Sequence, residues 1–485
     1  MMKYNTDMDK AFSIARIKKD KNFDGTFFFG VKTTGIFCRP SCPSPIAKEE
    51  NVIYFNTMFE ALEQGFRPCF RCRPDISTEY YNGNPDGTYV VNTALKMICD
   101  GYLNYHSIRE LSKELLVSDR YLRKLFIDNL GVPPVKIAKY HKALFAKKLL
   151  IFSDQSVTDI AFASGFGSIR QFNDVFKAVF GKPPTMVRKE SFNEKSASGN
   201  TTLLLRYKKP FDFRQTFSFM KQRAMEGVEV FTENSYGRTF RTDHAKGFFT
   251  VTDSPEQSAL ELRIGCDDIK CYMDIYNRVR KVFDLDTDFR LINEKFAKHE
   301  LLSKGMKNGH VPRLPVAFDP FEFLVRAILG QQISVKAATT LAARLVKKAA
   351  IKSDKSFPHG LDYFFPNPSE LLNSELDGFG VSKIRQATIK AAAHAILDKE
   401  VRLTANQSFD QFHKDFSALK GIGDWTVNYV AMRGLGMPDS FPASDLGVAR
   451  ALAKDGSTPS EKDIRKMAEH WRPYRAYATL CLWNL

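Results

Sequence analysis

The sequence predicts a multi-domain chain that is mainly α-helical with α+β parts. Its 485 residues, 44% of them hydrophobic, exceed the size at which one core stops growing. Two polar stretches rich in turn-forming residues, 79–88 and 190–200, have the composition of linkers, and a softer boundary lies near 302–315. We therefore expect four domains, with the bounds 1–78, 89–190, 201–302 and 303–485.

The charge of the chain indicates a polyanionic partner. Lysine and arginine number 71 against 55 aspartate and glutamate, which gives a net charge of +16 and a pI near 9.3. This balance favours nucleic acid over an acidic small molecule. No apolar run reaches the ~18 residues of a membrane span, and the N-terminal stretch lacks the apolar core of a signal peptide. We expect a cytoplasmic protein that binds DNA and no membrane.

Four of the eight cysteines form two close pairs in the first segment. Cys38 and Cys42 stand in "CRPSC", and Cys69 and Cys72 stand in "CFRC". In a reducing compartment such pairs predict metal ligands, and four thiolates are the set that a tetrahedral structural zinc prefers. The alternative is four buried small hydrophobic residues, but prolines beside each pair favour turns. Because a Cys₄ zinc site carries an excess negative charge, one of its sulfurs is also able to attack an alkyl group.

The residues around these cysteines resemble a known family. "DGTFFFGVKTTGIFCRPSC" and "EALEQGFRPCFRCRPD" are similar to the N-terminal domain of the Ada methyltransferase–activator family, over residues 8–76. The resemblance implies one Zn²⁺ held by all four cysteines, with Cys38 also accepting a methyl group from a methyl phosphotriester in DNA. Four arginines are candidates for phosphate contacts: Arg39, Arg67, Arg71 and Arg73.

The second segment contains an internal repeat. "SIRELS" (107–112) recurs as "SVTDIA" (156–161), and a Gly-x-Pro-Pro motif ends each copy. Ser118 and Ser168 are predicted to cap the second helix of each copy, which gives two helix-turn-helix units. A generic helical bundle is the alternative, but 15 basic against 8 acidic residues over 101–190 favour DNA. The candidates for groove contacts are Arg120, Arg123, Arg170, Gln171 and Asn173. The whole segment resembles the AraC-type DNA-binding domain.

The third segment alternates apolar and polar residues, as in "GFFTVTD", which predicts strands, whereas the fourth is helical. "LKGIGDWTVNYVAMRGL" places Gly421 and Gly423 between two helices, where a tight hairpin presents backbone N–H groups to a DNA phosphate. Asp445 in "FPASD" opens the next helix, and all three tryptophans follow Gly423. The alternative for these residues is core aromatics and a helix-capping aspartate.

Residues 203–485 resemble the helix-hairpin-helix (HhH-GPD) glycosylase superfamily, and the strand-rich part resembles the N-terminal α/β domain of the AlkA-type alkylpurine glycosylases. The resemblance rests on "RAILGQQISVKAATTLAARL", "LKGIGDWTVNYVAMRGLG", "FPASD" and "AEHWRPYRAYATLCLWNL". It implies that Asp445 is the catalytic aspartate, that Gly421 and Gly423 belong to the hairpin, and that a base pocket is lined by Trp425, Tyr429 and Trp483.

Two further expectations follow from the same resemblance. Gln331 and Gln332 would lie at the gap that an extruded base leaves in the duplex. AlkA-type enzymes insert a leucine there, at the position of Gln332, so the side chain that fills the gap is predicted to be polar in this chain. The members of this superfamily that also act as lyases have a lysine at the position where this chain has Trp425. We therefore expect a monofunctional glycosylase that needs no cofactor.

Together these observations predict a bacterial fusion of the adaptive response to alkylation. A zinc methyl acceptor and an AraC-type activator domain precede a DNA-3-methyladenine glycosylase II. Its partners would be alkylated and promoter double-stranded DNA and RNA polymerase, which implies association with the nucleoid. The alternatives are an activator that senses methylation through Cys38 and has an inactive glycosylase half, or an architectural DNA-binding protein.

Overall fold

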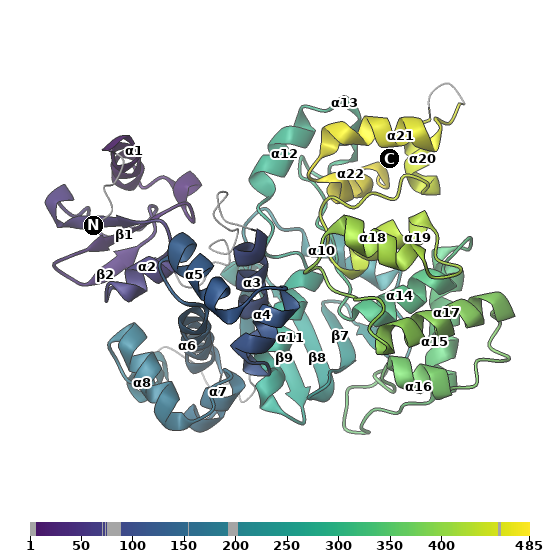
Figure 1. The fold of residues 1–485 in the computed structure, drawn as a ribbon, viewed down its shortest axis with the longest axis horizontal. Coiled ribbons are helices and arrows are strands. Elements are labelled where there is room, and N and C mark those ends of the chain that lie inside the picture. The colour runs from purple at the N-terminus through teal and green to yellow at the C-terminus, as the bar shows by residue number, and fades with distance from the viewer. Residues whose placement is uncertain are drawn as a thin grey trace. The chain divides into compact units, whose positions relative to one another are not determined.

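The structure is a computed structural model (Figure 1). It describes residues 6–69, 71, 72, 74, 89–153, 155–192, 202–453 and 457–485. Two compact units are distinguished: residues 1–206 with 269–275, and residues 207–268 with 276–485. The stretch predicted as the first linker, Arg73, and most of the second linker lie outside the described residues. Within the described part, no helix combines the length and the apolar character that crossing a membrane requires.

The first unit begins with a small sheet. Its elements are α1 (Thr6–Ile17), β1 (Phe28–Val31), β2 (Ile36–Cys38), β3 (Val52–Phe55), α2 (Met58–Glu63) and β4 (Arg67–Pro68). The strand order is β3-β1-β2-β4, with β1 antiparallel to both neighbours and β4 parallel to β2. Large buried rings such as Phe28, Phe37 and Phe55 fill its core. Because β2 ends at Cys38 and β4 runs directly into Cys69, the sheet brings the two cysteine pairs together.

The rest of the first unit is helical up to its last strand. Its elements are α3 (Tyr89–Cys99), α4 (Ile108–Glu114), α5 (Asp119–Leu130), α6 (Pro134–Phe152), α7 (Val157–Ala163), α8 (Ile169–Phe180), α9 (Pro184–Phe192) and β5 (Thr202–Arg206). The predicted caps are present: the Ser118 side chain accepts from the backbone N–H of Tyr121, and Ser168 accepts from that of Gln171. Gly131 and Gly181 end α5 and α8. The helix-turn-helix repeat is therefore confirmed.

The second unit contains an antiparallel sheet and a set of helices. The strands are β6 (Glu229–Phe231), β7 (Ser235–Arg241), β8 (Lys246–Ser254) and β9 (Ala259–Cys266), in the order β9-β8-β7-β6. Alternate residues of β8 are buried, as the sequence pattern predicts for a strand with one face on a core.

The helices of this unit carry the residues singled out in the fourth segment. They are α10 (Phe213–Lys221), α11 (Tyr272–Val282), α12 (Phe289–Ala297), α13 (Glu300–Gly305), α14 (Pro320–Leu329), α15 (Val335–Ala349), α16 (Pro368–Asn373), α17 (Lys383–Leu397), α18 (Phe409–Ser417), α19 (Asp424–Tyr429), α20 (Leu446–Ala451), α21 (Glu461–Ala468) and α22 (Arg475–Leu482). The first residues of α11 belong to the first unit. A π-helical turn, Val430–Gly434, continues α19. The fold class predicted from the sequence is confirmed.

Candidate metal centre and candidate active site

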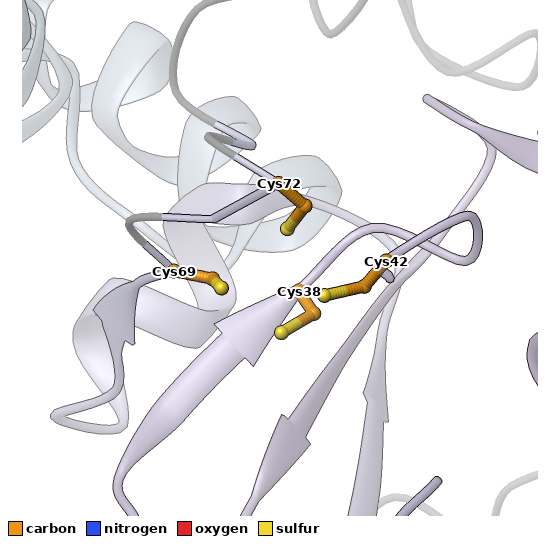
Figure 2. Close-up of side chains that lie close together, drawn as sticks. All are labelled: Cys38, Cys42, Cys69 and Cys72. Atoms are coloured by element: carbon orange, nitrogen blue, oxygen red, sulfur yellow. The ribbon is translucent and has the colours of Figure 1, made fainter. Parts of the chain in front are cut away.

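Four cysteine sulfurs converge in the first unit. The sulfur atoms of Cys38, Cys42, Cys69 and Cys72 all lie within 4.8 Å of one another, and each residue is at most 6% exposed. Figure 2 shows Cys38 at the end of its strand and the other three on loops, with the sulfurs pointing toward a common centre. Tetrahedral zinc with Zn–S bonds of about 2.3 Å needs sulfurs roughly 3.8 Å apart. The cluster therefore fits one zinc ion.

Backbone contacts hold these loops. The Cys69 N–H donates to the carbonyl of Phe37 at 3.0 Å, which aligns the second pair with Cys38. Asp24 accepts from both the backbone N–H of Ser41, at 3.0 Å, and its hydroxyl, at 2.6 Å. The Arg39 guanidinium lies 3.5 Å from the same carboxylate. These contacts hold the loop between Cys38 and Cys42 in the conformation that brings both sulfurs to the cluster.

The four thiols influence one another's protonation. Hydrogen bonding with Cys38 lowers the pKa of Cys42 to about 6, and hydrogen bonding with Cys42 raises the pKa of Cys38. Zinc binds cysteine as the thiolate, so zinc binding to this cluster would displace the thiol protons.

The residues predicted to contact a DNA groove lie on the second helix of each repeat. Those residues are Arg120 and Arg123 on α5, and Arg170, Gln171 and Asn173 on α8, and all five are exposed. The opposite face of each helix is buried, with Phe126 and Phe176 fully inside the core. This is the amphipathic arrangement that a recognition helix needs, since one face packs while the other stays free for DNA.

A large cleft of about 1840 Å³ opens in the second unit, and six of the residues predicted from the sequence line it. They are Gln331, Gln332, Trp425, Tyr429, Asp445 and Trp483. These residues come from four separate places in the chain, and the fold brings them to one cavity.

Asp445 receives four hydrogen bonds. It is the N-cap of α20, where its Oδ1 accepts from the backbone N–H groups of Gly447, at 2.9 Å, and Val448, at 3.1 Å. The Trp483 indole also donates to Oδ1, and the Trp425 indole donates to Oδ2, both at 2.9 Å. Asp445 therefore caps α20, as one reading of the sequence suggested, and also lines the cleft. These donors orient a carboxylate that faces the cleft.

Aromatic rings extend from this carboxylate. Trp425 stacks on Tyr429 with ring centroids 4.9 Å apart, and Tyr429 lies 6.3 Å from Trp483 in an edge-to-face arrangement. Phe323 on α14 adds a fourth ring, 5.1 Å from Tyr429. The third tryptophan, Trp471, is a core residue that is 2% exposed, and its indole donates to His299. The core-aromatic alternative therefore describes Trp471, whereas Trp425 and Trp483 line the cleft.

The hairpin between α18 and α19 requires glycine at Gly421. Its φ of +89° lies in the left-handed region, and a Cβ would come 2.2 Å from the hydroxyl of Thr388. Gly423 is the exposed N-cap of α19, and the next residue, Asp424, bonds to His413 and Arg465. Partial burial raises the pKa of Asp424, but these two hydrogen bonds outweigh burial and lower it, so Asp424 stays ionised.

The two glutamines after α14 have different environments. The Gln331 amide donates to the carbonyl of Gly421 and to the hydroxyl of Thr426, both at 3.0 Å, so it braces the hairpin. Gln332 is exposed and adopts a φ of +57°. Gln332 is therefore the one of the pair whose side chain remains available to a duplex.

Sequence reasoning missed two features of the cleft. Gly447 lets the Trp483 ring approach Asp445, because a Cβ at this position would come 2.9 Å from the ring and 3.0 Å from Oδ1. Arg223 and Arg433 also line the cleft. A charged residue inside the apolar run "YVAMRGLG" was the available signal for Arg433.

Comparisons with known families divide the chain in the same order. Residues 12–75 match the metal binding domain of Ada, and residues 111–190 match a helix-turn-helix domain. Residues 202–319 match the AlkA N-terminal domain, and residues 325–474 match the HhH-GPD superfamily of base excision DNA repair proteins.

Three relatives illustrate the match. A probable bifunctional transcriptional activator/DNA repair enzyme AlkA of Mycobacterium tuberculosis is 36% identical over 96% of this chain and 94% of its own. DNA-3-methyladenine glycosylase 2 of Escherichia coli is 28% identical over 58% of this chain and 95% of its own. The bifunctional transcriptional activator/DNA repair enzyme AdaA of Bacillus subtilis is 32% identical over 38% of this chain and 85% of its own.

Fold, cysteine cluster and cleft together define a DNA glycosylase fused to an Ada-type zinc-binding domain and a helix-turn-helix domain. The chain belongs to the family of bifunctional transcriptional activator/DNA repair enzymes with an AlkA-type glycosylase. The fusion predicted from the sequence is confirmed.

Proposed function

We propose that the second unit is a monofunctional glycosylase that excises N-alkylated bases such as 3-methyladenine from DNA. The observation that carries this proposal is the Asp445 carboxylate, held at the cleft by the indoles of Trp425 and Trp483. The specificity implied by the name of the Escherichia coli relative, DNA-3-methyladenine glycosylase 2, supports it.

The chemistry follows from charge. An N-alkylated purine is cationic and leaves as a neutral base, so its departure needs little acid catalysis. The aromatic rings of the cleft favour a flat cationic base, and the Asp445 carboxylate stabilises the sugar cation that develops as the bond breaks. Asp445 then orients or deprotonates the attacking water, which leaves an abasic site. Trp425 supplies an N–H donor and no amine, in keeping with a glycosylase that has no lyase step.

We further propose roles for the DNA-contacting residues. The backbone of the Gly421–Gly423 hairpin binds a phosphate, while Gln332 fills the gap that the extruded base leaves. Gln331 acts through the hairpin that it braces rather than by insertion. In the first unit, the exposed side chains of Arg120, Arg123, Arg170, Gln171 and Asn173 read promoter DNA.

We propose that the first unit binds one zinc ion and that Cys38 is its methyl acceptor. When bound, the zinc keeps the four sulfurs as thiolates. The Cys38 sulfur attacks the methyl carbon of a methyl phosphotriester, the C–O bond breaks, and the phosphate leaves as a diester anion. The methylated protein then recruits RNA polymerase at promoters of the nucleoid, as the activator names of its relatives suggest.

An abasic-site assay tests the enzymatic proposal. Purified full-length protein incubated with methylated duplex DNA should release methyladenine and leave alkali-labile sites without cutting the strand itself. The absence of abasic sites would favour the second candidate, an activator with an inactive glycosylase half. The Ada-type zinc cluster, which is independent of the cleft, keeps that candidate open.

A further inference from the structure

Helix α20 presents two exposed side chains to the cleft that the proposed mechanism does not use. They are Leu446, which directly follows Asp445, and Arg450, one turn further along the helix. Residues four apart lie on the same face of an α-helix, so the two side chains are neighbours at one side of the cleft. We call Leu446 and Arg450 the α20 edge.

The first half of the α20 edge is an apolar surface beside the Asp445 carboxylate. Leu446 is 71% exposed, the largest fraction among the described large apolar residues that line the cleft. Hydrogen bonds from Trp425, Trp483 and the backbone fix the neighbouring carboxylate. A sugar that reacts beside this carboxylate therefore comes within reach of Leu446. Packing the leucine against the sugar removes apolar surface from water, which favours the complex.

The second half is a cation without an acidic partner. Arg450 is exposed, and within the part of the chain that the structure describes no carboxylate forms an ion pair with it. Arg450 lies in the last turn of α20, so favourable interaction with the helix dipole is the alternative role for its charge. That role would act on the stability of the helix and not on DNA binding.

The reaction itself requires a positive charge on this side of the cleft. Each deoxyribose in a strand carries a phosphate on either side, so an extruded nucleotide brings negative charge toward the Asp445 carboxylate. Arg450 follows Asp445 by five residues, about 7.5 Å along the helix axis. A guanidinium at this position attracts the phosphate and offsets its repulsion by the carboxylate.

We propose that the α20 edge holds the damaged strand at the extruded nucleotide. The Arg450 guanidinium pairs with a backbone phosphate next to that nucleotide, and Leu446 packs against its deoxyribose. This inference rests on the proposed glycosylase function, and it gives the strand an anchor in addition to the Gly421–Gly423 hairpin. A DNA strand alternates anionic phosphates with apolar sugar faces, which matches the charge and the apolar surface of the edge.

Single-turnover excision of 3-methyladenine by the full-length protein tests the phosphate contact. The half-saturating protein concentration reports only complexes that are productive at the cleft, so DNA binding by the helix-turn-helix domain is not measured. Arg450→Gln should raise this concentration about tenfold at low salt and reduce its logarithmic salt slope by about one. Arg450→Lys keeps the charge and should restore most of the slope. Arg263→Gln, an exposed arginine on β9 that does not line the cleft, is the matched control and should keep the parental slope.

The maximal rate in the same assay tests the apolar contact. Leu446→Ala should lower this rate roughly tenfold, because the extruded nucleotide loses most of its packing against the edge. A 2-aminopurine placed beside the damaged base brightens when its neighbour leaves the stack, and it should brighten less with this variant. Leu291→Ala on α12, where the leucine is 63% exposed and outside the cleft, is the control and should match the parental protein.

The outcomes separate DNA contact from helix stability. If Arg450→Gln melts at a lower temperature but keeps the salt slope of Arg263→Gln, the charge acts on the helix dipole and the phosphate contact is overturned. Parental excision and parental fluorescence with Leu446→Ala would overturn the apolar contact. Either result, obtained beside a parental protein that releases methyladenine, contradicts this inference alone. A parental protein that releases no base would contradict the proposed function and this inference with it.

Discussion

Asp445 is the residue on which the contacts of the cleft converge. Each of its carboxylate oxygens accepts an indole N–H, and one of them also accepts two backbone N–H groups. Such donors fix the carboxylate before substrate arrives, so little reorganisation is needed when positive charge develops on the sugar. The same donors make the geometry sensitive to small displacements of the indoles.

Gly447→Ala tests that sensitivity. The new Cβ would meet the Trp483 ring at 2.9 Å and Asp445 Oδ1 at 3.0 Å, so one of them has to move. Because a displacement of about 1 Å near a reacting group commonly costs up to 10²-fold, we expect excision to fall by ten- to a hundredfold. Helix α20 should remain folded, since alanine favours a helix over glycine.

The matched control for this substitution is Gly167→Ala. A Cβ at Gly167 meets no atom within 4 Å, and its φ is not positive. Single-turnover excision and thermal melting of both variants provide the measurement. If a folded Gly447→Ala protein excises the base at the parental rate, the close approach of Trp483 to Asp445 has no role in catalysis.

At the scale of elements, helices α5 and α8 present the groove-contacting candidates. Replacing both Arg120 and Arg170 by alanine should weaken binding to a duplex selected from a random pool by about 1–3 kcal/mol per lost base contact. Binding to unselected DNA should change much less, because phosphate contacts dominate it. Lys189→Ala on α9 is the control, since it removes an exposed charge from another helix. Equal losses on both kinds of DNA would show that these arginines contact phosphates only.

The small sheet β3-β1-β2-β4, which carries the four cysteines, is the second element whose stability can be tested separately. Replacing Cys69 and Cys72 by serine removes two of four ligands, so we expect metal analysis to find less than one zinc per chain in place of one. Chelation of the parental protein should unfold the residues around the cluster and leave excision by the second unit unchanged. Cys266→Ser, a change outside the cluster, should retain zinc. Unaltered zinc content in the double variant would contradict the Cys₄ site.

Residues with short-range signals could be predicted from the sequence. The spacing of Cys38, Cys42, Cys69 and Cys72 was sufficient for the metal centre, and the repeated serine caps were sufficient for the two helix-turn-helix units. Each cysteine pair and each capping bond is a local signal, completed within a few residues, whereas the meeting of the two cysteine pairs depends on the pairing of β2 with β4.

Features that depend on distant parts of the chain could not be predicted. The hydrogen bond from Trp483 to Asp445 joins positions 38 residues apart, and the bracing of the hairpin by Gln331 spans 90 residues. The packing of Arg433 against the Phe219 and Phe323 rings likewise joins distant positions. Only the folded chain shows which of two adjacent glutamines is braced and which is exposed.

At the scale of the whole molecule, the net charge of +16 makes DNA affinity depend strongly on salt. We predict that methyl transfer to Cys38 strengthens this electrostatic attraction to DNA. Converting the Cys38 thiolate to a thioether removes one negative charge near the DNA, so the methylated protein should bind promoter DNA more tightly. After incubation with phosphotriester DNA, mass spectrometry should locate the methyl group on Cys38, and titrations over a range of salt should show the gain. Equal binding before and after methylation would show that methyl transfer repairs the DNA but does not act as a signal.

The most direct test of the account is Asp445→Asn in single-turnover excision of 3-methyladenine from methylated duplex. The amide can still cap α20, but it lacks the negative charge that stabilises the sugar cation and offers one indole no acceptor. We expect the rate to fall by about 10²–10³ while DNA binding and the melting temperature stay close to the parental values. Asp463→Asn, a surface acid-to-amide change on α21, should excise normally. A folded Asp445→Asn protein that binds DNA and releases methyladenine at the parental rate would contradict the assignment of Asp445.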